Sequence, residues 1–210
     1  MSNETLNTQE FKLAASGAGI IVCQRRSTHS FRALLSTRAA SVGLGLGITG
    51  GGFVEIAEIF SQKHGYIIDT AEEAWREATE ENVDFEKLFP LDEYLERVQS
   101  VSTMHVRVND VNGVHGTNFY ALTVTDEEWE KALALPPGDE RFGPLMEIWV
   151  DFTDKVVHRN RPEEAITLYM DDGKEVESGF YHQHELRALG HIAWHIQQGY
   201  LWAPPKENVV

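Results

Sequence analysis

The sequence predicts an α/β domain, and three observations support this prediction. Two apolar runs of strand length, residues 14–24 and 32–38, lie near the N-terminus. An acidic helix follows them, and a helix with an apolar stripe is expected at residues 182–200. With 210 residues, the chain is long enough for one domain with a sizeable core. We expect residues 1–12 to form a polar tail and residues 13–210 to form the domain.

Composition and charge narrow the classes of function. The net charge of −15 argues against binding extended nucleic acid, because contacts to phosphates need clustered Lys and Arg. No apolar run approaches the roughly 20 residues of a membrane-spanning helix, and the first residues lack the pattern of a signal peptide. We therefore expect a cytoplasmic protein with no membrane partner. The single cysteine, Cys23, excludes an internal disulfide and is expected to be buried.

The first half of the chain is expected to begin with a β-hairpin, because a polar turn at residues 25–30 joins the two early apolar runs. Residues 41–49 alternate glycine with apolar residues, and this pattern is compatible with either a thin strand or a loop over the site. The acidic helix is expected to start at Asp69 or Thr70, since Thr70 and Glu73 have the spacing of a capping box.

The second half of the chain is expected to alternate strands and helices. Residues 85–95 are expected to connect two elements without forming one. Apolar alternation predicts strands at residues 94–109, 117–125 and 146–152. Thr125 and Glu128 form a capping box that predicts a helix over residues 126–135. Residues 162–170 are expected to start helical and end extended.

The acidic helix carries three carboxylates on one face. Residues three and four apart share a helical face, so Glu77, Glu80 and Glu81 converge, with Arg76 beside them. Carboxylates this close repel one another unless a positive charge lies among them. A hard divalent cation with oxygen ligands, Mg²⁺ or Mn²⁺, satisfies that need and also binds the phosphates of a substrate.

A glycine segment precedes this helix. Three consecutive glycines, Gly50 to Gly52, allow the backbone to approach a ligand closely, and Glu55 and Glu58 follow them. The glycine segment and the acidic helix are therefore expected to form two walls of a site for a metal ion and a pyrophosphate.

These residues resemble the box of the Nudix hydrolase family. That box has a glycine, five residues, a glutamate, seven residues, and then Arg-Glu-aliphatic-x-Glu-Glu-x-Gly-aliphatic. This chain has Gly52, five residues, Glu58, and then Arg-Glu-Ala-Thr-Glu-Glu at residues 76–81. Two departures stand out. The spacer after Glu58 has seventeen residues, as if residues 59–68 were inserted, and Val83 stands where the family has its last glycine.

The resemblance implies a fold and an activity. The fold is a Nudix-like α/β/α sandwich with a mixed sheet. The activity is that of a Nudix-type pyrophosphohydrolase, a metal-dependent hydrolase that cleaves the phosphoanhydride of a nucleoside diphosphate linked to another moiety. The expected partner is a nucleotide-type small molecule. A homodimer interface in the C-terminal half is left open.

The resemblance also implies roles for single residues. The expected catalytic residues are Glu77, Arg76 and Glu80. The expected metal ligands are Gly51, through its backbone carbonyl, and Glu77, Glu80 and Glu81. The expected substrate contacts are Glu55, Glu58 and Arg38. Independently of the resemblance, one or two of the arginines before the box are candidates for a bidentate phosphate contact, and these are Arg25, Arg26, Arg32 and Arg38. The general base is Glu77 or a later carboxylate, and Glu147 and Asp151 are both open candidates.

Other interpretations of the same residues stay open. The domain is alternatively a noncatalytic Nudix-like sensor that binds a nucleotide or a protein, or an acidic structural protein whose helix matches by chance. Histidines at 184, 191 and 195 share a helical face and suggest zinc, although a polar flank of the helix is the favoured interpretation. A base-stacking platform is open among Tyr120, Trp129, Trp149, Tyr169 and Trp194, although core positions are more common for aromatic residues.

Overall fold

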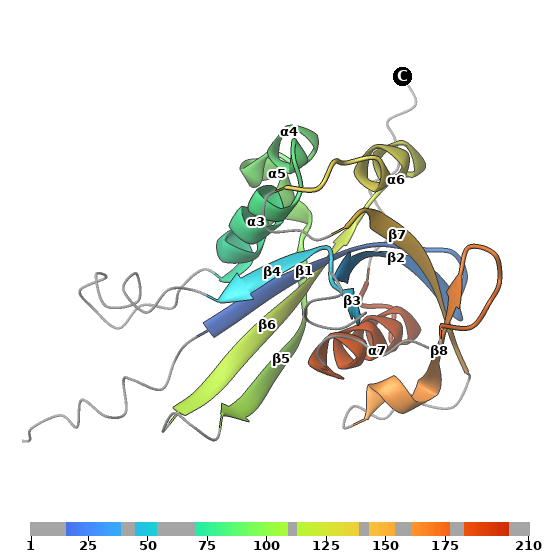
Figure 1. Ribbon diagram of the computed structural model, residues 1–210. Coiled ribbons are helices and arrows are strands. Elements are labelled where there is room, and N and C mark those ends of the chain that lie inside the picture. The colour runs from blue at the N-terminus through green and yellow to red at the C-terminus, as the bar shows by residue number, and fades with distance from the viewer. Residues whose placement is uncertain are drawn as a thin grey trace, which may run out of the picture.

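The computed structural model describes residues 16–38, 45–53, 70–108, 113–138, 143–153, 161–176 and 183–201. In these ranges the chain forms an eight-stranded sheet with helices on both faces (Figure 1). The strands are β1 (Ser16–Arg25), β2 (Ser30–Arg38), β3 (Gly45–Gly47), β4 (Gly50–Phe53), β5 (Gln99–Val108), β6 (Gly113–Thr123), β7 (Leu145–Phe152) and β8 (Ile166–Met170). The helices are α3 (Thr70–Glu81), α4 (Phe85–Leu88), α5 (Leu91–Arg97), α6 (Asp126–Leu133), the 3-10 helix η1 (Pro162–Ala165) and α7 (Gln183–Gln197).

The sheet is mixed, as the resemblance implies. Its strand order is β5-β6-β1-β2-β7-β8, with β3 paired to β2 and β4 paired to β1. Strands β1 and β6 run parallel, whereas the other neighbouring strands run antiparallel. The predicted N-terminal hairpin is confirmed by the antiparallel register of β1 and β2, in which Cys23 lies opposite Ala33.

The sheet separates two apolar cores, and strand β1 contributes to both. Successive side chains of a strand point to opposite faces. Ile20 and Val22 therefore lie in the core beneath α3 to α6, whereas Ile21 and Cys23 lie in the core that α7 covers. All four side chains are at most 1% exposed, which explains why this strand is apolar without alternation. The arrangement is an α/β/α sandwich (Figure 1).

One part of the sequence prediction is wrong. Residues 85–95 form helices α4 and α5 and not a connecting segment, and β5 begins at Gln99 and not at residue 94. Phe85, Phe89 and Tyr94 bury their rings in the core under α3, so tertiary burial supports two helices that are too short to be recognised from their periodicity. Pro90 directly precedes α5, where its missing N–H removes no helical hydrogen bond.

The predicted capping box at the start of α6 is confirmed and is reinforced from α5. The Glu128 amide donates to Thr125 Oγ1 at 3.2 Å, and the Thr125 amide donates to Glu128 Oε2 at 2.8 Å. Arg97 donates to both carboxylate oxygens of Glu128, at 2.7 and 2.9 Å. Burial raises the pKa of Glu128, but the hydrogen bonds from Arg97 and Thr125 outweigh it and lower that pKa overall. The cap therefore also fixes α5 against α6.

The Cys23 thiol is expected to be inert in the folded protein. It is 1% exposed, and burial raises its pKa to about 12, so it stays protonated at pH 8 where a free thiol begins to ionise. A thiol reagent at pH 8 should label Cys23 at least about a hundredfold more slowly in buffer than in denaturing urea. Equal rates in the two conditions would contradict the burial.

No helix in the described ranges combines the length and the apolar character that crossing a membrane requires.

Candidate functional site

Helix α3 lies directly on the glycine strand β4. A Cβ added at Gly50 would lie 2.5 Å from the Ala78 Cα atom, so only glycine permits this approach. Ala74 and Ala78 of α3 are fully buried beneath the helix. This close packing fixes the position of α3 on the sheet. The glycine at position 50 therefore brings a helix close to the strand, in addition to any role it has towards a ligand.

The Arg76 guanidinium gathers three glutamates of α3. Arg76 donates two hydrogen bonds to Glu73, from Nη2 at 2.6 Å and from Nε at 3.1 Å. It also donates one hydrogen bond to Glu77 and one to Glu80. Glu73 and Glu77 are each 7% exposed, whereas Glu80 is exposed to solvent. The structure thus brings together Arg76, Glu77 and Glu80, as the sequence predicts, and adds Glu73 to them.

The charge of Arg76 is strongly stabilised by its neighbours. The hydrogen bond to Glu73 is the largest cause that raises the pKa of the Arg76 guanidinium, and desolvation opposes it. The hydrogen bond to Glu80 and the negative charge of Glu77 raise this pKa further. Arg76 is therefore a permanent cation beside the glutamates.

The donor set of α3 fits a hard divalent cation by its chemistry. Glu77 and Glu80 lie beside the single guanidinium of Arg76, which is also paired with Glu73, and Glu81 follows in the last turn of the helix, so negative charge is in excess there. Carboxylate oxygens are the ligands that Mg²⁺ prefers. In the described residues, no three His, Cys, Asp or Glu side chains converge as a ready-made metal cluster. Glu77 and Glu80 must therefore turn away from Arg76 before they can hold a cation together.

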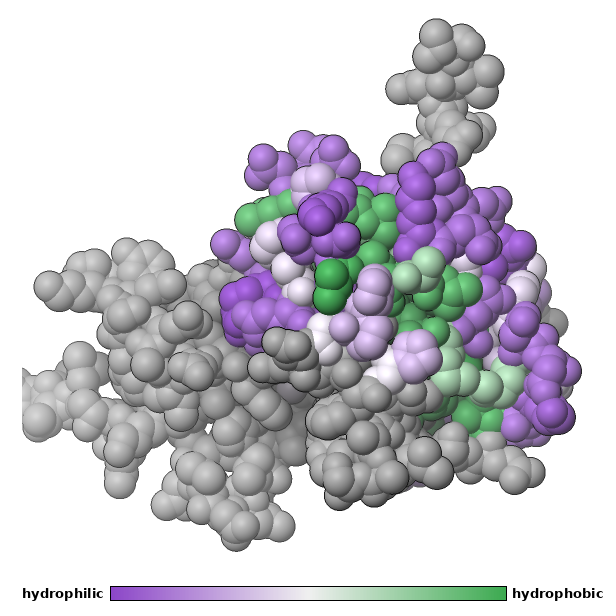
Figure 2. Space-filling view, turned by 45° about the horizontal axis from the view of Figure 1, so that its top comes forward, coloured by the Kyte–Doolittle hydropathy of each residue, from purple (hydrophilic) through white to green (hydrophobic). Residues whose placement is uncertain are grey.

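The surface of the helical layer is largely hydrophilic. Figure 2, which brings the helical side of the molecule forward, shows hydrophilic side chains over the helices and an apolar area between them. Val83, which follows α3, is 44% exposed, and Leu95, which lies in α5, is 37% exposed. The Glu80 side chain is 43% exposed, so an ion from solvent has access to its carboxylate.

At the C-terminal end of α3, where the Nudix box has its last glycine, this chain uses a buried asparagine side chain. Asn82 is fully buried, and its Nδ2 donates to the Ala78 carbonyl at 2.8 Å and to the Thr49 carbonyl at 3.0 Å. In the described residues, Asp84 is the non-glycine residue with positive φ, at 69°. The left-handed turn therefore comes one residue after Val83, and valine at that position is unstrained.

Residues 136–138 pair with further backbone groups at the C-terminal end of α3. The Val83 amide donates to the Pro136 carbonyl at 3.0 Å, and the Gly138 amide donates to the Glu81 carbonyl at 2.8 Å. A Cβ added at Gly138 would lie 2.0 Å from the Glu80 carbonyl oxygen, so this contact requires glycine. The Glu81 carbonyl and the Val83 amide at the helix end thus find hydrogen-bond partners in a distant part of the chain.

Replacing Asn82 by alanine is expected to destabilise the fold by about 2 kcal/mol, because two buried hydrogen bonds are lost. Asn82→Asp should cost at least as much, since a carboxylate would face two carbonyl oxygens. The matched control is Val83→Ala at the exposed neighbouring position, where the expected cost is below about 0.5 kcal/mol. Urea unfolding measures all three variants, and equal free energies for Asn82→Ala and Val83→Ala would contradict the proposed tie to Thr49.

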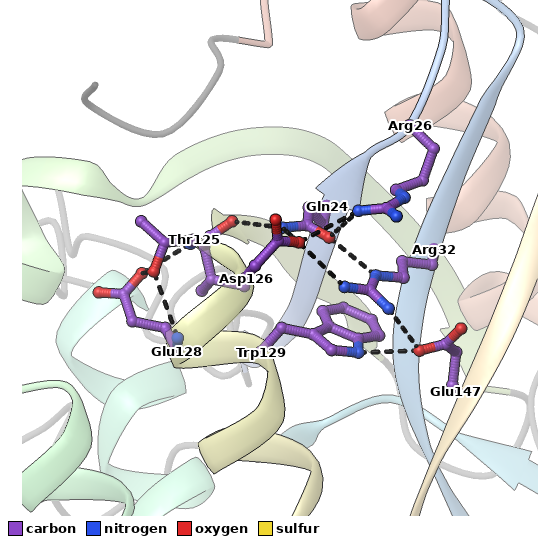
Figure 3. Close-up of polar contacts among 9 residues, drawn as sticks. Gln24, Arg26, Arg32, Thr125, Asp126, Glu128, Trp129 and Glu147 are labelled. Carbon is purple, nitrogen blue, oxygen red and sulfur yellow. Dashed lines mark hydrogen bonds and ion pairs between the residues drawn. The ribbon is translucent and has the colours of Figure 1, made fainter. Parts of the chain in front are cut away.

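A second polar cluster lies between β1, β2, β7 and α6 (Figure 3). The buried Arg32 guanidinium lies over the Trp129 ring, 4.2 Å from its centroid, and donates to Gln24 and Glu147, each at 2.8 Å. The Trp129 indole N–H donates to the same Glu147 oxygen at 2.8 Å. Asp126 adds a longer ion pair with Arg32, at 3.4 Å. Every group in this cluster is bound to another, which indicates a role in stability.

This cluster bears on the candidates for a general base. Glu147 accepts hydrogen bonds from Arg32 and Trp129, and its side chain is 13% exposed, so it is committed to the interior. Asp151 is exposed on β7, opposite Ser30 of β2. Glu147 is therefore poorly suited to take a proton from an attacking water.

Several predicted site residues lie outside the described residues. Glu55, Glu58 and the insertion at residues 59–68 fall in the undescribed range 54–69. For Arg38 only the backbone is described, as the last residue of β2, opposite Gly45. The backbone of Gly51 is described: it lies in β4, opposite Gly19 of β1.

The histidines of α7 do not form a metal cluster in the part of the chain that the structure describes. The His195 Nε2 atom lies 3.0 Å from the Val101 carbonyl of β5, and its ring packs edge-on against Trp194. His191 is half-buried on the same helix. For His184 the side chain lies outside the described residues.

Sequence reasoning missed two residues of the α3 site. The capping box accounts for Glu73 in the sequence, but its spacing of three residues from Arg76 is also a signal for an ion pair on one helical face. Asn82 gave no signal, because its partner Thr49 is 33 residues away in the sequence.

No protein-family model matches the sequence, and no curated protein matches it. Among solved structures, the chain is similar to a MutT/nudix family protein from Enterococcus faecalis, with 12% identity and a TM-score of 0.46 over 91% of this chain and 68% of that one. It is similar to the NUDIX domain of Shewanella oneidensis NrtR complexed with ADP ribose, with 14% identity and a TM-score of 0.40 over 69% of this chain and 81% of that one. For Shewanella oneidensis NrtR itself the identity is 13% and the TM-score 0.32, over 58% of this chain and 55% of that one. The first of these structures is a MutT/nudix family protein and the second is a NUDIX domain.

Proposed function

We propose that the protein is a metal-dependent hydrolase that cleaves the phosphoanhydride of a nucleoside diphosphate linked to another moiety. The observation that carries this proposal is the acidic face of α3, where Glu77 and Glu80 meet at Arg76 on a helix seated against β4. This is the part of the chain that matches the Arg-Glu-x-x-Glu-Glu core of the Nudix box.

Each residue of that core has a proposed task. Glu77, Glu80 and Glu81 hold Mg²⁺ or Mn²⁺, with the backbone carbonyl of Gly51 as a further ligand. The bound cation neutralises the diphosphate and lowers the pKa of the attacking water. Arg76 orients Glu77 through its hydrogen bond. Glu77 is the proposed general base, and a carboxylate from a later part of the chain is the alternative.

The proposed substrate contacts are Glu55, Glu58 and Arg38, with Arg38 as a bidentate ligand of phosphate. The substrate class includes modified nucleoside triphosphates, ADP-ribose, dinucleoside polyphosphates and capped RNA ends. Because the chain carries a net charge of −15, small nucleotides suit it better than long RNA.

The experiment is a turnover assay on this panel of nucleotides, with Mg²⁺ or Mn²⁺ and with a chelator. It compares the wild-type protein with Glu80→Gln plus Glu81→Gln, and with Glu72→Gln as a control at an exposed position of the same helix. We expect metal-dependent turnover of at least one substrate by the wild type and the control, and none by the double variant. Turnover that survives in the double variant would refute the assignment.

A noncatalytic sensor is the second candidate, and one observation favours it. Arg76 hydrogen-bonds Glu73, Glu77 and Glu80, so their charge is partly neutralised without a cation. Nucleotide binding without turnover of any substrate on the panel would select this candidate.

A further inference from the structure

Glu73 is not part of the Nudix box, yet it accepts two hydrogen bonds from Arg76. It lies one helical turn before Arg76 and is 7% exposed. Its two carboxylate oxygens accept from two different nitrogens of the guanidinium, at 2.6 and 3.1 Å. Bidentate pairs of this kind fix the plane and the position of an arginine side chain.

Arg76 is held unequally by its partners. It donates two hydrogen bonds to Glu73 but only one each to Glu77 and Glu80. Turning Glu77 or Glu80 towards a cation breaks one contact with Arg76, whereas releasing Glu73 breaks two. The Arg76 side chain is also 40% exposed, so it has room to move when a partner is lost.

We propose that Glu73 is a positioning residue that keeps the Arg76 guanidinium in place while Glu77 and Glu80 turn from it to a divalent cation. Without Glu73, Arg76 competes with the cation for those two carboxylates. This inference rests on the proposed function, because it assumes that Glu77 and Glu80 bind the cation.

The test measures Mn²⁺ affinity by the paramagnetic resonance signal of free Mn²⁺. The proteins are the wild type, Glu73→Gln, Arg76→Gln and the double variant that combines them. Glu72→Gln is the matched control, since it removes the same charge from the neighbouring, exposed position of the helix. Urea unfolding checks that each variant is folded at the assay temperature.

We expect Glu73→Gln to weaken Mn²⁺ binding about tenfold, and Glu72→Gln to weaken it less than about twofold. In the Arg76→Gln background, Glu73→Gln should have no more effect than Glu72→Gln, because its partner is absent. The kcat at saturating Mn²⁺ should change less than about threefold in Glu73→Gln, since Glu73 affects the binding of the cation and not the chemical step. Glu73→Asp, which keeps the charge, should restore most of the affinity and serves if Glu73→Gln is poorly folded.

Two results would refute this inference and leave the proposed function standing. In the first, Glu73→Gln weakens binding equally with and without Arg76, which would make Glu73 a metal ligand or a simple source of charge. In the second, Glu73→Gln behaves as Glu72→Gln does. A wild-type protein that binds no Mn²⁺ would instead refute the proposed function, and this inference with it.

Discussion

A Glu77→Gln variant is expected to lose metal-dependent turnover by about a thousandfold in kcat, because Glu77 is both a proposed metal ligand and the proposed general base. The amide keeps the shape of the side chain and removes its charge. The hydrogen bond from Arg76 to the side-chain oxygen remains available in glutamine, so the helix should stay in place. The measurement is kcat at saturating Mg²⁺ on the best substrate of the panel.

The control for this prediction is Glu72→Gln, which changes the same kind of side chain at an exposed position of α3. It should keep kcat within about twofold of the wild type, since surface substitutions away from a site have small effects. A fall of less than about tenfold in Glu77→Gln would show that the base is another carboxylate. In that case the general base would be a carboxylate from a later part of the chain.

Replacing Arg32 by alanine is expected to destabilise the fold by about 3–5 kcal/mol, because the Glu147 carboxylate, whose side chain is 13% exposed, then loses its cation. The Arg32 side chain is 9% exposed and also covers the Trp129 ring. Urea unfolding followed by tryptophan fluorescence measures the loss.

Two variants sharpen the Arg32 prediction. Arg26→Ala removes a more exposed arginine that also contacts Gln24 and Asp126, and it should cost less than about 1 kcal/mol. Arg32→Leu combined with Glu147→Leu removes both charges and should recover part of the lost stability, because the Trp129 indole N–H then loses its acceptor. If Arg32→Ala costs no more than Arg26→Ala, the cluster in Figure 3 is not a buried ion pair of structural importance.

Local patterns predicted much of this fold. The hairpin of β1 and β2, the capping box of α6 and the long helix α7 each depend on neighbouring residues, whose spacing can be seen in the sequence. The helical placement of Arg76 beside Glu80 was predictable for the same reason, because residues four apart share a face. The contact of Arg76 with the adjacent Glu77 does not follow from that spacing.

Contacts between distant segments were not predictable in this way. Helices α4 and α5 have four and seven residues, too few for a clear period, and they depend on burying Phe85 and Tyr94 against other elements. The pairing of Asn82 with Thr49 and the approach of Gly138 to Glu80 join segments that the fold alone brings together.

The glycine segment shows the limit of reading a motif by itself. Gly50 was expected to let the backbone approach a ligand, and the structure shows that it also lets α3 approach β4. Both roles need a residue without a side chain, so the sequence alone does not separate them. The same holds for Arg76, whose partners include a glutamate outside the box.

The proposed function requires that α3 binds a divalent cation and is not a closed set of salt bridges. Equilibrium binding of Mn²⁺ is therefore measured for the wild-type protein and for Glu80→Gln plus Glu81→Gln. We predict saturable binding by the wild type that the double variant loses. Absence of saturable binding by the wild type would contradict the claim, and Arg76 would then be the cation that the glutamates of α3 require.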